Sequence, residues 1–199
     1  MERDWWVRTL LVLQRPAAVF AALRRADDHD ARQEPILAIV LLAGMAGVLA
    51  TNSFGRLLDD FELDAVVVPI LVFVAGGLYG VTAYFGLGAL VHLGSRFAGS
   101  GAGYRYARHV VAFAAVPLVL SLVVWPVRLA AFGEDEFRSG GSDDGFGGSV
   151  FEAIELGAVV WACALLVLGV RVLNRWPWPR ALAASLPALA VPVTLYALA

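Results

Sequence analysis

The chain has 199 residues, of which 60% are hydrophobic and 16% are charged, and its formal net charge at pH 7 is -2. A soluble domain normally carries about 25% charged residues, so this composition excludes a soluble globule. The small negative net charge also argues against a nucleic-acid partner, because binding to phosphates needs a concentrated basic face.

Residues 1–34 do not resemble a signal peptide, because the apolar run Leu10–Leu13 is too short and Pro16 follows where a small-residue cleavage site should be. The segment combines arginines with Trp5, Trp6 and an apolar set that contains Val19, Phe20 and Leu23. We expect an interfacial amphipathic N-terminal helix, or two short ones, on the cytoplasmic surface, with aromatic side chains toward lipid and arginines toward headgroups. A solvated basic tail is the alternative.

Residues 35–199 predict an all-α fold, a polytopic membrane bundle of five transmembrane helices. Two uncharged runs, Ala65 to Val91 and Val110 to Val127, have 27 and 18 residues, close to the ~20 apolar residues that one span needs. The predicted spans are about 35–53, 65–93, 107–132, 150–172 and 181–199. Prolines inside the third and fifth predict local kinks. In a four-span alternative, the last helix is re-entrant.

The second predicted span has glycines at helical spacing, among them Gly76, Gly80 and Gly88. Helices in lipid associate where small side chains let their backbones approach, so we expect these three residues to be helix-packing positions. The alternative is that a transmembrane helix simply tolerates glycine.

Arginine supplies every basic side chain, which suggests a GC-rich prokaryotic genome. Twelve of the fifteen arginines fall in the N-terminal segment, the loop between the second and third spans, and the loop between the fourth and fifth. The positive-inside rule therefore predicts a multi-pass protein of the cell membrane with a cytoplasmic N-terminus and an outside C-terminus.

The middle of each predicted span contains no Asp, Glu, Lys, Arg or His, and this absence argues against an ion-coupled pump or transporter. Near the outer surface, Glu152 and Glu155 share one helix face and could form an ion pair with Arg128 that fixes how the third and fourth spans meet. Snorkelling of Arg128 without a partner and a substrate-binding site are the alternatives.

Basic and aromatic residues gather at the inner loop between the second and third spans. This combination suits anionic lipid headgroups or an acidic partner, although charges that set topology and an aromatic belt explain it equally well. The candidate lipid or partner surface comprises Arg96, Tyr104, Arg105, Arg108 and His109.

No pattern predicts catalysis or a cofactor. Cys163 has no histidine in a suitable register, and no serine lies in a nucleophile elbow. The acidic loop between the third and fourth spans lacks the alternating ligands of a calcium-binding EF-hand, so we expect no metal site.

Two stretches resemble the Yip1 domain family in its prokaryotic branch. Residues Arg15 to Leu23, RPAAVFAAL, are similar to the family's short motif before the membrane, and Tyr104 to Leu120 are similar to its hydrophilic turn leading into a helix with an early proline, here Pro117. The resemblance implies an integral membrane protein without known enzymatic activity. Eukaryotic members associate with Rab-type GTPases, but this chain lacks their longer acidic DLYGP-type motif, so GTPase binding is not carried over.

The sequence thus predicts a non-catalytic membrane protein that contacts membrane lipids, a protein partner or a second copy of itself. The competing hypothesis is a small channel, transporter or lipid-handling protein with a path along the glycine-rich and proline-kinked helices.

Overall fold

The computed structural model describes residues 3–25, 34–50, 67–133 and 146–198. These ranges contain helices joined by turns and no strand, so the all-α prediction is confirmed for the described residues. The helices are α1 (Arg3–Gln14), α2 (Pro16–Arg25), α3 (Glu34–Leu49), α5 (Val67–Phe97), α6 (Tyr104–Ala114), α7 (Val116–Ser121), α8 (Trp125–Phe132), α9 (Phe146–Asn174) and α10 (Trp178–Leu198).

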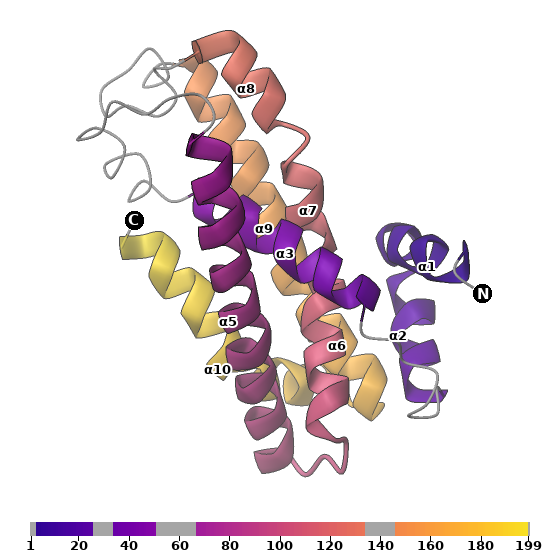
Figure 1. Cartoon of the computed structure of the whole chain (residues 1–199). Helices are drawn as coiled ribbons and strands as arrows, with labels where there is room; N and C mark the ends of the chain where they lie inside the picture. The colour runs from indigo at the N-terminus through magenta and orange to yellow at the C-terminus, as the bar shows by residue number, and fades with distance from the viewer. Residues whose placement is uncertain (1–2, 26–33, 51–66, 134–145, 199) are drawn as a thin grey trace.

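Three segments of the described chain are long and apolar enough to cross a membrane: Val67–Phe97, Tyr104–Phe132 and Phe146–Asn174. In Figure 1, α5 and α9 run most of the height of the molecule, and α6, α7 and α8 follow one another in the same direction. The apolar part of α3, Ile36–Leu49, is shorter than a full span. The structure therefore confirms a bundle of apolar helices, and the number five stays a prediction.

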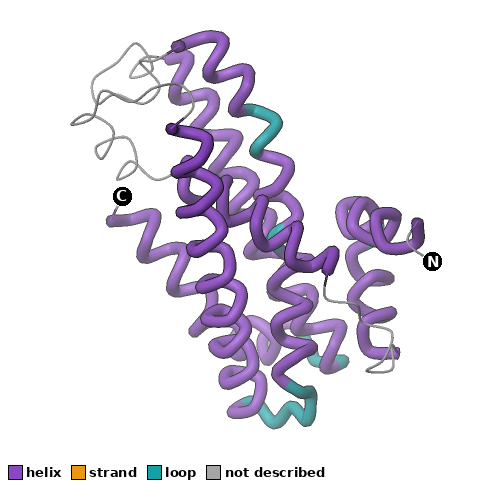
Figure 2. Tube along the Cα trace, in the orientation of Figure 1, coloured by secondary structure: helices purple, strands orange, loops and turns teal. Residues whose placement is uncertain are grey.

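Prolines divide the third predicted span into three helices, with breaks at Ala115 and at residues 122–124 (Figure 2). Pro126 has no N–H to donate to Leu122, and the N–H of Trp125 donates to the Leu122 carbonyl instead, at 3.2 Å. A shorter turn therefore satisfies the carbonyl that the proline frees. By contrast, α10 continues as one helix through Pro187 and Pro192.

Helices α3 and α5 cross in direct backbone contact. A Cβ on Gly80 would overlap the Val40 carbonyl oxygen, and one on Gly76 would lie 2.6 Å from the Cα of Met45. From the α3 side, a Cβ on Gly44 would lie 2.6 Å from the Cα of Gly80. Only glycine permits this approach, which explains why two of the three predicted packing residues lie at the crossing.

The N-terminal helices pack against the bundle instead of presenting their apolar side chains only to lipid. Val12 and Phe20 are both 0% exposed and belong to the main apolar core, together with Val110 and Val170. A Cβ on Gly169 of α9 would lie 3.0 Å from the Phe20 ring, so this glycine makes the space that the ring fills. The expectation that the aromatic side chains of this segment face lipid is wrong for Phe20, because its ring fills a space inside the bundle.

Candidate functional site

One end of the bundle gathers arginines from four helices and from the turn that joins α9 to α10. We call this the arginine-rich end and define it by Arg96, Arg105, Arg108, Arg171, Arg175 and Arg180. Residues 65–133 and 156–199, which supply all of them, contain no aspartate or glutamate. The positive charge of this end is therefore not balanced by carboxylates of its own segments.

Arg108 lies in an aromatic cage formed by α5 and α6. Its guanidinium carbon is 4.8 Å from the ring centroid of Tyr104, 4.9 Å from that of Phe85 and 5.4 Å from that of Tyr84. Cation–π attraction of this kind holds an arginine without neutralising it. Gly88 leaves room for the aliphatic stem, since a Cβ there would lie 2.5 Å from the Arg108 Cγ. The third predicted packing glycine thus packs against an arginine side chain.

The cage is tied to α5 by a hydrogen bond. The Tyr104 hydroxyl donates to the backbone carbonyl of Phe85 at 2.8 Å, and the Tyr104 ring lies 5.8 Å from that of His92. Tyr104 therefore holds the start of α6 against α5 and fixes one wall around the Arg108 guanidinium.

The turn after α5 is held by the end of α9 and the start of α10. Arg180 donates from Nε to the Ala98 carbonyl at 3.0 Å and also donates to it from a terminal nitrogen, and its guanidinium stacks on Trp176 at 4.6 Å. Ser100 donates to the side-chain oxygen of Asn174. Gly99 turns the chain here with a φ of +88°, a conformation that glycine adopts easily. Arg180 consequently acts as a cap for the end of α5.

Two members of the predicted inner surface differ in accessibility. Arg96 is exposed in the last turn of α5, whereas His109 is only 2% exposed. Placing His109 on that surface is therefore wrong. The reason is its position on α6, where it lies in a run of buried residues that includes Val110 and Val111.

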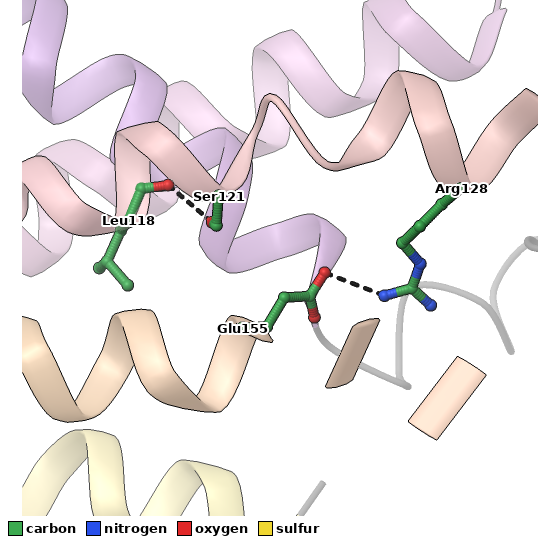
Figure 3. Close-up of polar contacts among 4 residues, drawn as sticks. All are labelled: Leu118, Ser121, Arg128 and Glu155. Carbon is green, nitrogen blue, oxygen red and sulfur yellow. Dashed lines mark hydrogen bonds and ion pairs between the residues drawn. The ribbon is translucent and has the colours of Figure 1, made fainter. Parts of the chain in front are cut away.

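At the opposite end of the bundle, Arg128 of α8 and Glu155 of α9 form an ion pair. Figure 3 shows the two side chains extending toward each other, with a terminal nitrogen of Arg128 donating to Oε1 of Glu155 at 2.9 Å. The side chains are 9% and 13% exposed. The Arg128 guanidinium also lies 4.8 Å from the ring of Trp125 and 5.8 Å from that of Phe151. Glu152 is exposed.

The ion pair lies well inside the length of α9. Glu155 is nine residues from the first residue of a 29-residue helix, or ~14 Å along an axis of ~44 Å. A ~30 Å hydrocarbon core centred on this helix would begin ~7 Å from its end. The pair would then lie below the headgroups, where each charge needs the other.

Sequence reasoning missed two close contacts that glycines make possible. One is Gly169, described above, and the other is Gly94 of α5, where a Cβ would overlap the Ala184 carbonyl oxygen of α10. Each contact joins a single glycine to a residue far away in the chain, so no local spacing in the sequence indicates it. The acidic loop residues considered for calcium, 134–144, lie outside the described residues, and the rest of the chain as described holds no group of three metal-ligating side chains.

Comparison with protein families gives a match over almost the whole chain: the Yip1 domain model matches residues 10–199. Neither a curated protein nor a solved structure matches the chain.

Proposed function

Because the chain belongs to the Yip1 domain family, whose model covers residues 10–199, we propose that it is a five-span membrane protein that works by contact, without catalysis. In this proposal α3 and α10 cross the membrane together with the three longer apolar segments. The N-terminus and the arginine-rich end face the cytoplasm, and the C-terminus faces outward. The arginine-rich end binds the partner, a lipid or an acidic protein surface.

The observation that carries the proposal is the concentration of six arginines at one end of the bundle. Its arginines come from segments without a single carboxylate, and Arg171 and Arg180 stack on Trp178 and Trp176 at 4.5 and 4.6 Å. Stacking preserves the positive charge, so this end can still attract an anionic surface. Inside the bundle, the main core cluster of the described residues is built from aliphatic and aromatic side chains, which favours contact over conduction.

Photocrosslinking in native membranes tests this function. A photoreactive amino acid at Gly101, which is exposed and has no atom within 4 Å of an added Cβ, reports on the arginine-rich end. The same group at Phe146, which is 87% exposed at the start of α9, is the control. We expect adducts with lipid or protein at position 101 that fall about 30-fold when Arg105 and Arg171 are both changed to glutamine, since each arginine near a membrane surface contributes about 1 kcal/mol.

Adducts that are equally abundant at position 146, or that persist in the double variant, would contradict a function at the arginine-rich end.

A further inference from the structure

The Arg108 cage combines a positive charge with a hydrogen-bond donor that has no acceptor among the described residues. Its guanidinium is held by three rings, and no described carboxylate pairs with it. The Arg108 Nε is buried and makes no hydrogen bond to any described residue. A phosphate oxygen would supply both the missing negative charge and hydrogen-bond acceptors.

The depth of Arg108 favours a ligand from the membrane. Its stem packs on Gly88, nine residues before the end of α5, or ~14 Å along the axis. A ~30 Å hydrocarbon core centred on this 31-residue helix would end ~8 Å before the last residue of α5. With the core centred in this way, the guanidinium would lie within one side-chain length of the boundary, the zone in which arginines extend toward phosphates.

An apolar stripe on α5 leads from the cage into the membrane. Leu78, Val81 and Phe85 are 72%, 41% and 44% exposed, and their spacing of three and four residues puts them on one helix face. Phe85 is also a wall of the cage. A molecule with its phosphate at Arg108 could therefore lay an acyl chain along this stripe.

We propose that Arg108, caged by Tyr84, Phe85 and Tyr104, binds the phosphate of an anionic glycerophospholipid whose acyl chain lies along Leu78, Val81 and Phe85. This inference rests on the proposed function and names its partner. Arg108 supplies the charge and the donors, and the three rings keep the guanidinium in place before the lipid arrives, which lowers the entropy cost of binding.

Native mass spectrometry of the full chain, purified in detergent, tests the proposal. The protein is titrated with phosphatidylglycerol and with phosphatidylcholine of the same acyl chains. We expect the first phosphatidylglycerol to bind about ten-fold more tightly than phosphatidylcholine, and Arg108→Gln to weaken it about ten-fold, because a charge-assisted contact is lost. Arg15→Gln, which removes the same charge from an exposed position outside the arginine-rich end, is the control and should change the affinity less than about two-fold.

Thermal unfolding in the same detergent keeps the test decisive if Arg108→Gln folds poorly. Phosphatidylglycerol should raise the melting temperature of the unmodified chain, whereas phosphatidylcholine and glycerol 3-phosphate should not. Equal shifts for both lipids, protection by glycerol 3-phosphate alone, or equal losses in the Arg108 and Arg15 variants would overturn the proposal. If photocrosslinking at position 101 in native membranes then gives a protein adduct that depends on the arginines, the proposed function stands and its partner is a protein.

Discussion

Replacing Gly80 with leucine is expected to lower the free energy of unfolding by about 3 kcal/mol, because the new side chain meets backbone and not a movable side chain. A Cβ at this position already overlaps the Val40 carbonyl oxygen and would lie 3.2 Å from the Cα of Gly44. Helices α3 and α5 must separate to admit a leucine, and the packing along their whole crossing weakens. Unfolding in detergent, followed by circular dichroism, measures the loss.

Gly86 provides the matched control on the same helix. It is exposed, and an added Cβ would meet no atom within 4 Å. Gly86→Leu should therefore leave stability unchanged or raise it by up to about 1 kcal/mol, since leucine favours a helix more than glycine does. Equal losses in the two variants would show that the α3–α5 crossing does not depend on close backbone contact.

Removing the carboxylate of Glu155, at the end of the bundle opposite the arginine-rich end, is expected to cause a comparable loss of stability. Glu155→Ala takes away the acceptor at 2.9 Å from Arg128, whose side chain is only 9% exposed, and leaves the guanidinium buried without that counter-charge. Breaking a buried pair by deleting one partner typically costs about 3 kcal/mol or more. The variant should therefore unfold at a markedly lower temperature in detergent.

Two further variants distinguish the ion pair from a general effect of charge. Glu152→Ala removes the same side chain from an exposed position three residues earlier and should change stability by less than about 0.5 kcal/mol. Replacing both Arg128 and Glu155 with leucine should recover much of the loss, because no buried charge is then left behind. If the double variant is as unstable as Glu155→Ala, the pair does not join α8 to α9 in the way described.

The helices themselves could be predicted from the sequence, because a long uncharged run in lipid must satisfy its backbone N–H and C=O groups with hydrogen bonds within the segment. The second span was expected at 65–93, and the structure has a helix at Val67–Phe97 that is long and apolar enough to be that span. Gly76 and Gly80 could be predicted as packing positions because their spacing repeats along one helix face. The breaks around Pro117 and Pro126 were expected only as kinks, since the local pattern does not show how far the chain departs from a helix.

The contacts between distant segments could not be predicted in the same way. Phe20 is buried because Gly169 leaves space for its ring, and the two residues are far apart in the chain. The Arg108 cage likewise needs Tyr84 and Phe85 of one helix and Tyr104 of the next to meet around one guanidinium. Composition predicted a basic, aromatic surface at this end, but only the three-dimensional arrangement separates Arg108 in its cage from the buried His109.

Cysteine labelling tests the central claim most directly, namely that the arginine-rich end lies inside the cell. With the sole cysteine, Cys163, changed to alanine, single cysteines replace Gly101 at the arginine-rich end and Phe146 at the other end. A maleimide that does not cross membranes should label Phe146→Cys in intact cells and label Gly101→Cys only after permeabilisation. Labelling of Gly101→Cys in intact cells would place the arginine-rich end outside and contradict the account.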